Sequence, residues 1–191
     1  EANNAETRAL VLLELGLDKT LMEQYFWWLG RIAAGDLGHS FIHGGPVLDQ
    51  ILRRLPITFQ IGFMSMFFAI FIGVPLGVLS AIKRGTVMDF ATRVISLIGI
   101  STPNFFLGTL IVVFGAIYFP GIRTLGYVPF SESPLENLER MIWPSLTLGV
   151  GVGAILLRYT RSSVLEVLGE DYVRTAEAKG LSPFSVIFVH A

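Results

Sequence analysis

The sequence has no cysteine, so disulfide bonds, thiolate catalysis and cysteine-type zinc sites are excluded. Charged residues are also few: they make up 15% of the chain, whereas a soluble domain carries about 25%. The formal net charge is −1, so the overall balance indicates neither nucleic acid nor an anionic membrane surface as a partner. The apolar residues are gathered into long blocks, which is typical of a membrane protein.

Motifs of catalysis are missing as well. The sequence contains no GxSxG, no HExxH, no phosphate-cradling glycine loop and no pair of carboxylates on one helix face. We therefore expect neither an enzyme nor a cofactor site in this chain.

Three blocks without a charged residue predict three membrane spans, at about residues 55–82, 94–122 and 141–157. The first two exceed the roughly 20 residues that a spanning helix needs, and the third is at the short limit. The alternative for each block is a buried helix of a soluble protein. The blocks contain no Asp, Glu, Lys, Arg or His, although carriers driven by ion gradients usually need such a group at membrane depth.

Basic residues in short loops mark the cytoplasmic side of a membrane protein. The link 83–93 holds three basic residues and one acidic residue, whereas the link 123–140 holds two arginines and three glutamates. We therefore expect residues 83–93 and 158–191 inside the cell, and residues 1–54 and 123–140 outside. This order requires a further span upstream, and both ends of the chain look cut.

The outer segment 1–54 is predicted to form short helices and loops. Leu21, Tyr25, Trp28 and Leu29 follow helical spacing, and Tyr25, Trp27 and Trp28 suit a membrane interface. His39 and His43 are four residues apart, as in some metal sites. Glycines flank them and no acidic third ligand is suitably spaced, so loop histidines are the preferred interpretation over a metal site.

Small residues and prolines stand out within the spans. The stretches GVPLG (Gly73 to Gly77) and GVGVG (Gly149 to Gly153) each place two glycines four residues apart, which favours close helix packing. The stretch GISTPNFFLG contains three polar residues and a proline in succession: Ser101, Thr102, Pro103 and Asn104. Because Pro103 lacks a backbone donor, we predict irregular backbone there, either on a solute path or as a kink satisfied by neighbouring helices.

The tail from Asp171 onwards reads as a helix, a turn and a second helix. Asp171 suits a helix start and Lys179 a helix end, and Gly180 follows as a predicted left-handed residue. Ser182 is a predicted N-cap with Pro183 at the first helical position, and Leu181 with Val186 would form a hydrophobic staple across that cap. Such a helix could dock on another protein or be a plain connecting loop, and local physics leaves both open.

The tail stretch EDYVRTAEAKGLSPFSVIFVHA resembles the cytoplasmic loop of binding-protein-dependent ABC transporter permeases of the dipeptide, oligopeptide and nickel group. Further stretches match that group in the same order: LGLDKTLMEQYFWWL, GDLGHSF, PVLDQILRRLPITF, GVPLGVLSAIK, GISTPNFFLG and WPSLTLG. Arg174, Thr175, Ala176 and Gly180 fall on the loop's EAA-then-glycine motif. Arg174 stands where Glu is usual and Thr175 where Ala is usual, as is common in the peptide branch, while Glu177 stands where a basic residue is frequent.

The resemblance implies a polytopic all-α bundle with the type I ABC importer permease fold, here truncated at both ends: six spans, of which three are represented. It implies an ATPase-coupling role for Asp171, Tyr172, Arg174, Thr175, Ala176, Glu177, Lys179 and Gly180, and makes Ser101, Thr102, Pro103 and Asn104 candidates for the translocation path. The implied partners are a second permease, two cytoplasmic ATP-binding subunits, an extracytoplasmic solute-binding protein and membrane lipid, with no nucleic acid. ATP and magnesium would be bound by the partners, and the chain would lie in the inner (plasma) membrane.

The expected function is therefore that of a permease subunit of an ATP-driven importer. Its solute could be a short peptide, a glutathione-like thiol or chelated nickel. The alternatives are a fragment of an ion-gradient-driven transporter and a purely structural membrane subunit.

Overall fold

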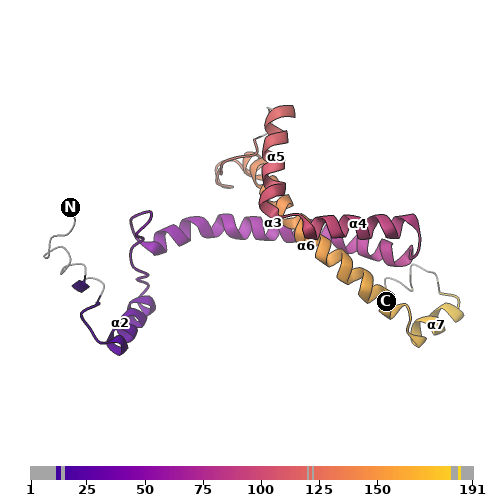
Figure 1. The fold of residues 1–191 in the computed structure, drawn as a ribbon, viewed down its shortest axis with the longest axis horizontal. Helices are drawn as coiled ribbons and strands as arrows, with labels where there is room; N and C mark the ends of the chain where they lie inside the picture. The colour runs from indigo at the N-terminus through magenta and orange to yellow at the C-terminus, as the bar shows by residue number, and fades with distance from the viewer. Residues whose placement is uncertain (1–11, 14–15, 120, 122, 182–184, 186–191) are drawn as a thin grey trace. The chain divides into compact units, whose positions relative to one another are not determined.

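The computed structural model describes residues 12–13, 16–119, 121, 123–181 and 185. Apart from one isolated β-bridge, the regular secondary structure of these residues consists of α-helices (Figure 1). In chain order they are α2 (Leu21–Ala33), α3 (Val47–Ile82), α4 (Val87–Ser101), α5 (Asn104–Tyr118), α6 (Pro134–Val167) and α7 (Asp171–Ala178).

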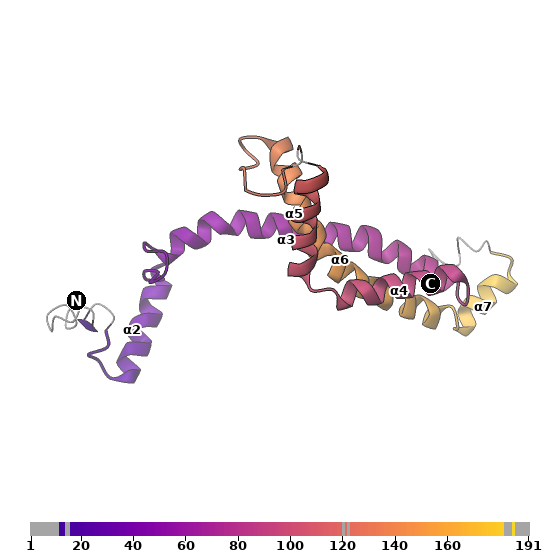
Figure 2. The same ribbon diagram turned by 45° about the horizontal axis from the view of Figure 1, so that its top comes forward.

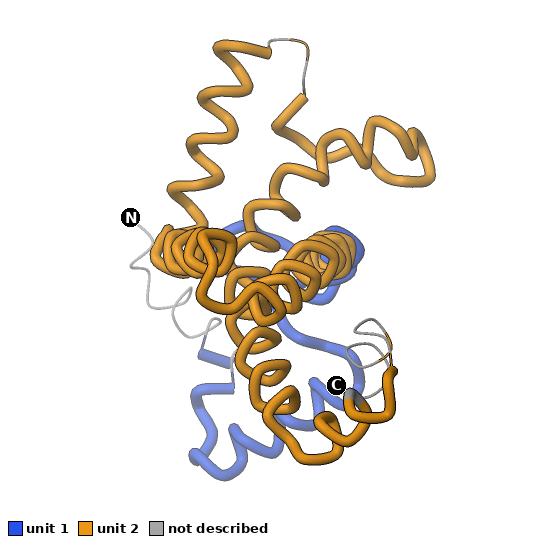
Figure 3. The backbone as a smooth tube through the Cα atoms, turned by 90° about the vertical axis from the view of Figure 1, so that its right-hand side faces the viewer, with its two compact units in different colours: residues 1–57 blue, residues 58–191 orange. Residues whose placement is uncertain are grey.

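The chain divides into two compact units, residues 1–57 and 58–191 (Figure 3). The first unit contains α2, which begins after Thr20 because the Glu23 carboxylate accepts hydrogen bonds from the Thr20 N–H and hydroxyl. Most of its apolar residues are exposed, among them Leu21, Tyr25 and Trp28. The helix predicted from the spacing of these residues is confirmed by α2.

Among the described residues, two helices are long and apolar enough to cross a membrane by themselves, α3 and α6. With 36 and 34 residues, they extend over about 54 and 51 Å at ~1.5 Å per residue, well beyond the ~30 Å of hydrocarbon. The blocks 55–82 and 141–157 lie inside these helices.

The uncharged block 94–122, predicted as one membrane span with irregular backbone at Pro103, is divided into two helices near that proline. It falls on α4 and α5, which together pass the same test but are bent by 97° at their junction. Figure 2 shows α5 turning away from α4 at this break. The helix also begins earlier than the block, at Val87, and so includes Asp89.

Glycines set the contact between α3 and α6. A Cβ atom on Gly73 would lie 2.5 Å from the Gly153 carbonyl oxygen, and one on Gly77 would lie 2.7 Å from that of Leu157. A Cβ on Gly149 would lie 2.9 Å from the Ser65 carbonyl oxygen. The two helices approach so closely because these positions carry no side chain, which confirms the close packing predicted from the glycine spacing.

Polar side chains also join the helices of this unit. Gln60 of α3 exchanges amide hydrogen bonds with Asn137 of α6, and the Asn137 Nδ2 also donates to the Val128 carbonyl at 2.7 Å. Farther along, the Ser96 hydroxyl of α4 donates to the Ala154 carbonyl of α6 at 2.9 Å. These buried polar groups are thus paired across helices, as a low-dielectric interior favours.

Candidate functional site

The helix break between α4 and α5 is built by Thr102 and Pro103. Thr102 is extended, with φ −84° and ψ 118°, because the ring of a following proline disfavours the helical conformation. Its hydroxyl and N–H both donate to the Ile98 carbonyl, at 2.7 and 2.9 Å. The Pro103 carbonyl then accepts from the N–H groups of Phe106 and Leu107. The irregular backbone predicted here is confirmed, and these groups of Thr102 and Pro103 are hydrogen-bonded locally.

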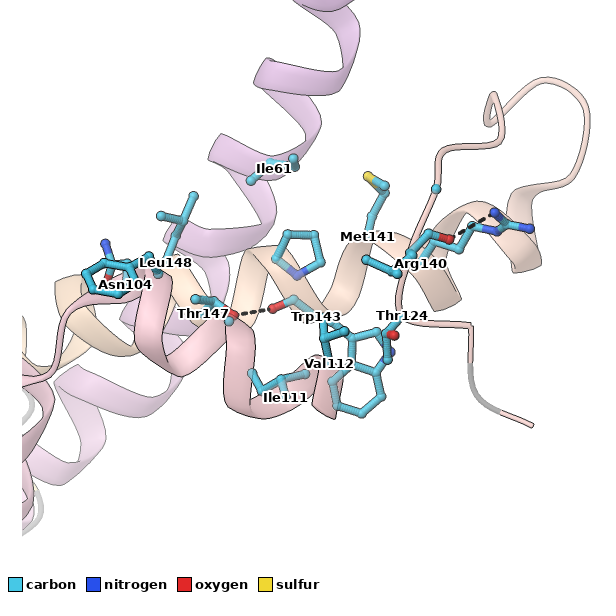
Figure 4. Close-up of a pocket in the computed structure, with 15 residues that line it drawn as sticks. Ile61, Asn104, Ile111, Val112, Thr124, Arg140, Met141, Trp143, Thr147 and Leu148 are labelled. Atoms are coloured by element: carbon cyan, nitrogen blue, oxygen red, sulfur yellow. Dashed lines mark hydrogen bonds between the residues drawn. The ribbon is translucent and has the colours of Figure 1, made fainter. Parts of the chain in front are cut away.

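A cavity of about 520 Å³ opens beside this break (Figure 4). It lies between α5, the start of α6 and the segment 124–126, with one residue, Ile61, from α3. Its lining is mainly apolar and includes Phe105, Ile111, Val112, Met141, Pro144 and Leu148, with the polar residues Asn104, Thr124, Arg140 and Thr147. A mainly apolar cavity with a few polar groups is the usual form of a small-molecule site.

The polar side chains of the cavity are partly engaged by their own chain. The Arg140 Nη1 donates to the Leu125 carbonyl at 3.0 Å, and the Thr147 hydroxyl donates to the Trp143 carbonyl at 2.8 Å. The indole N–H of Trp143, which also lines the cavity, has no acceptor in the described part of the chain. An unpaired buried donor is costly, so this N–H is a polar group that the described residues leave unsatisfied.

The four predicted path residues are placed differently. Asn104 lines the cavity, and its Oδ1 lies 3.3 Å from where a Cβ on Gly151 would be. Thr102, Pro103 and Asn104 line a second cavity of about 350 Å³ against α6. Ser101 lines neither of these two cavities. A solute path at the break remains a prediction, with Asn104 as its best-placed residue.

Helix α7 is attached to the end of α6 by one apolar stripe. Val173 and Ala176 are 1% and 7% exposed and pack with Val167 and Leu168. The opposite face is open: Asp171, Tyr172, Arg174, Thr175, Lys179 and Gly180 are exposed. Of the residues assigned to coupling, Ala176 is thus packed on its own chain, and the Glu177 side chain lies outside the described residues.

Val173 has the most buried side chain among the described residues of α7, and it was not among the predicted coupling residues. Its signal in the sequence is the spacing of three to Ala176, which places both on one helix face.

The turn after α7 has the predicted conformation. Gly180 has φ +81°, a left-handed value that residues with a Cβ rarely adopt. The Leu181 N–H donates back to the Ala176 carbonyl at 3.3 Å, closing the end of the helix as a Schellman motif does. The predicted N-cap Ser182, together with Pro183 and Val186, lies outside the described residues.

A buried ion pair that the sequence did not predict lies at the other end of α4. The Asp89 carboxylate, 1% exposed, accepts from the Arg161 Nε at 2.8 Å and Nη2 at 3.1 Å. It also accepts from the Ser80 hydroxyl at 2.8 Å and the Gly85 N–H at 3.1 Å. Thr92 completes the group by donating to the Ser80 hydroxyl. We call these five residues the Asp89 cluster.

The Asp89 cluster joins α3, the turn after it, α4 and α6. Its signal in the sequence was the single acidic residue of the basic link 83–93, but nothing in the sequence paired that residue with Arg161.

The two histidines of the first unit lie in a loop, as predicted. His39 forms an isolated bridge with Pro46, and the His43 N–H donates to the Ser40 hydroxyl at 3.2 Å. Among the described residues, no three His, Asp or Glu side chains gather in a metal-binding group.

Comparison with known proteins places this chain in a family. Residues 73–191 match the family described as binding-protein-dependent transport system inner membrane component. The dipeptide transport system permease protein DppB of Escherichia coli strain K12 is 36% identical over 209 residues, which cover 97% of this chain and 62% of the relative. A protein of Brucella suis biovar 1 named as a peptide transport system permease is 37% identical over 186 residues, which cover 97% of this chain and 59% of the relative.

A third relative is a peptide ABC transporter permease protein of Sinorhizobium fredii, 38% identical over 178 residues, which cover 93% of this chain and 57% of the relative. The chain thus spans about three fifths of the length of these relatives. It belongs to the family of binding-protein-dependent transport system inner membrane components, and its fold is the all-α type I ABC importer permease fold expected from the sequence.

Proposed function

We propose that this chain is the membrane-spanning part of a permease subunit of an ATP-driven importer for short peptides or related small solutes. The observation that carries the proposal is α7, whose buried Val173 and Ala176 fix it to the end of α6 while its other face stays open. An exposed helix attached to a spanning helix can transmit a force from a partner. The printed names of the relatives, which concern peptide and dipeptide transport, support the solute class.

The proposed assembly has four kinds of component. This permease pairs with a second permease subunit, two cytoplasmic ATP-binding subunits and an extracytoplasmic solute-binding protein. ATP and magnesium are bound by the ATP-binding subunits, because the sequence has no phosphate-cradling glycine loop. Nucleic acid has no part in this function.

The proposed location is the inner (plasma) membrane, with residues 1–54 outside and 158–191 in the cytoplasm. The contact between Asp89 and Arg161 supports this topology, because it brings the basic link 83–93 to the end of α6 that carries Arg158 and Arg161. Basic residues from two segments of the chain thus gather on one side, as expected of the cytoplasmic side.

In the proposed mechanism, closure of the ATP-binding subunits displaces α7, and α6 follows because α7 is packed on its end. Since α3 is held against α6 by backbone contacts at Gly73 and Gly77, α3 moves with it. The cavity around Asn104 and Trp143 then opens alternately to the two sides by rigid-body rocking.

The test uses the full-length permease with its partner subunits in proteoliposomes. With ATP supplied and ion gradients collapsed by ionophores, uptake of a labelled dipeptide should continue. Uptake that stops when the ion gradients are collapsed would support a gradient-driven carrier. Uptake by proteoliposomes that contain the partner subunits but lack this permease would support a purely structural subunit.

A matched pair of variants examines α7 in the same assay. Tyr172 of α7 and Tyr159 of α6 are both exposed. Tyr172→Ala should weaken binding of the ATP-binding subunits and lower uptake, because it removes a large side chain from the open face of α7, on which these subunits are proposed to dock. Tyr159→Ala should leave both unchanged. Equal effects of the two variants would contradict docking on α7.

A further inference from the structure

A cavity of about 360 Å³ lies between α4 and α6, next to the second cavity at the helix break, with which it shares Ile100. Its lining combines three arginines with apolar residues: Arg93, Leu97, Ile100, Leu157, Arg158 and Arg161, together with Ser96. The Ser96 hydroxyl is engaged by the Ala154 carbonyl. The cavity therefore offers a ligand positive charge and apolar surface.

Positive charge exceeds negative charge at this cavity. Among the described residues, Asp89 is the carboxylate in contact with these arginines, and both of its oxygens are taken by Arg161. The Arg93 Nε lies 3.5 Å from the same carboxylate, and about half of the Arg93 side chain is exposed. Arg158 has no ion pair within the described part of the chain. Three cations thus share one anion, and Arg93 and Arg158 retain capacity for a second one.

The apolar part of the cavity continues from the charged part along one face of α4. Leu97 and Ile100 follow Arg93 by four and seven residues, so they lie one and two helical turns farther along the same face. They are 64% and 37% exposed. A ligand that fits has an anionic head, which contacts the arginines, and a hydrocarbon chain, which lies along these two residues.

We propose that this cavity binds an anionic phospholipid of the cytoplasmic leaflet. Arg93 and Arg158 contact the headgroup phosphate, and an acyl chain lies over Leu97 and Ile100. Basic pockets between membrane helices on the cytoplasmic side suit such headgroups. The net charge of −1 gives no sign of this site, because the acidic residues that balance the arginines lie elsewhere in the chain.

The occupant is a lipid rather than a free phosphate ion because an isolated phosphate would leave the exposed apolar surface of Leu97 and Ile100 unused. The proposal rests on the cytoplasmic orientation given under the proposed function, but it requires neither ATP hydrolysis nor transport.

The test measures lipid retention by the full-length permease with its partner subunits. The complex is reconstituted in nanodiscs containing equal parts of phosphatidylglycerol and phosphatidylcholine, extracted in mild detergent and analysed by native mass spectrometry. The wild type should retain phosphatidylglycerol in preference to phosphatidylcholine. Arg158→Gln should lower that retention about fivefold, the effect of ~1 kcal/mol per basic residue.

The control is Arg84→Gln, which removes a basic residue of the link 83–93 that does not line the cavity. It should retain phosphatidylglycerol as the wild type does. Equal retention by the two variants would overturn the proposal, and so would equal retention of the two lipids. Displacement of the lipid by glycerol 1-phosphate at the same concentration as intact phosphatidylglycerol would also overturn it, since the cavity would then bind a free anion.

Discussion

Asp89 connects three segments through a single buried carboxylate. It receives hydrogen bonds from Ser80 of α3, from the Gly85 backbone in the following turn and from Arg161 of α6. An ion pair in a low-dielectric interior adds little over a well-packed apolar pair, but removing one partner leaves an uncompensated charge. The pair therefore acts as a constraint on how α3, α4 and α6 meet.

Asp89→Asn should lower the stability of the full-length permease markedly. The change keeps the size of the side chain but leaves the largely buried guanidinium of Arg161 without a counter-charge. The measurement is the unfolding midpoint of the detergent-solubilised protein. Arg93→Gln is the control, since Arg93 is half exposed and 3.5 Å from the same carboxylate, and exposed pairs contribute little. A fall for Asp89→Asn less than about twice that for the control would contradict this account.

The stability of the loop around Asp36, in the first unit, is predicted to depend on pH. The Gly38 N–H and the Arg31 guanidinium both donate to its carboxylate, at 2.9 and 2.7 Å, and lower its pKa below the ordinary value of 3.8. A carboxyl with a lowered pKa stabilises the fold fully above its ordinary value, and that contribution is lost as the pH falls through the lowered pKa. Hydrogen exchange at the Gly38 amide, corrected for intrinsic rates, should therefore lose protection as the pH falls below 3.8.

Asp36→Asn is the control for that measurement, because an amide does not titrate. In the variant, the protection of the Gly38 amide should not change over the same pH range. A wild type and a variant that lose protection in parallel would show that another group controls the loop.

At the scale of elements, the glycines of α3 allow a comparison within one helix. Gly73→Ala places a Cβ 2.5 Å from the Gly153 carbonyl oxygen, whereas a Cβ on Gly62 meets nothing within 4 Å. Gly73→Ala should destabilise the full-length permease by about 1–3 kcal/mol, because the helices must move apart. Gly62→Ala should be neutral or stabilise it by up to about 1 kcal/mol, since alanine favours the helix. Denaturant unfolding of the solubilised protein measures both, and a neutral Gly73→Ala would contradict the contact.

The end of α7 is a second element whose geometry can be tested. At Gly180 a Cβ would meet nothing within 4 Å, but φ is +81°, so a substitution there acts only through the backbone. A β-branched residue is strained in this conformation, which costs about 1–2 kcal/mol, whereas asparagine tolerates it. Gly180→Val should therefore unwind the end of α7 and lower the solute transported per ATP hydrolysed.

Gly180→Asn is the matched control and should retain most of the coupling. The ratio of uptake to hydrolysis in proteoliposomes measures both variants. Normal coupling in Gly180→Val would exclude the end of α7 from force transmission.

The sequence predicted those parts of the fold that depend on neighbours in the chain. The left-handed Gly180 and the break at Pro103 follow from local backbone preferences. The glycine pairs of α3 and α6 were recognisable by their spacing, although their contact with each other was not. Asp89 was missed as a site because its partner is 72 residues away, and no periodicity links the two.

At the scale of the whole spanning unit, α6 connects the features described above. The Asn137 contact with α3 lies near its start, the cavity residues Trp143 and Thr147 follow, and the glycine contact and Arg161 come next. Helix α7 is packed on its end. The two sides of α6 differ. On one side α3 is in backbone contact with α6, whereas on the other side α5 is separated from part of α6 by the cavity of about 520 Å³.

This difference predicts which helices move relative to each other during transport. A disulfide between Ala69→Cys and Gly153→Cys would join α3 to α6, where a Cβ on Gly153 lies 3.3 Å from the Ala69 Cα. A disulfide between Gly108→Cys and Thr147→Cys would join α5 to α6 across the cavity wall, where a Cβ on Gly108 lies 3.6 Å from the Thr147 Cγ2. The sequence has no cysteine of its own, so each pair can be oxidised without a competing thiol in this chain.

Oxidation of the first pair should leave ATP-driven uptake at about the level of the reduced protein, because α3 and α6 move as one body. Oxidation of the second pair should abolish uptake, and a reductant should restore it, because the cavity can no longer change shape. The four single-cysteine variants control for the substitutions themselves. If the α3–α6 disulfide stops transport while the α5–α6 disulfide permits it, the moving boundary lies at the glycine contact instead, and the cavity at the helix break is a static feature of the fold.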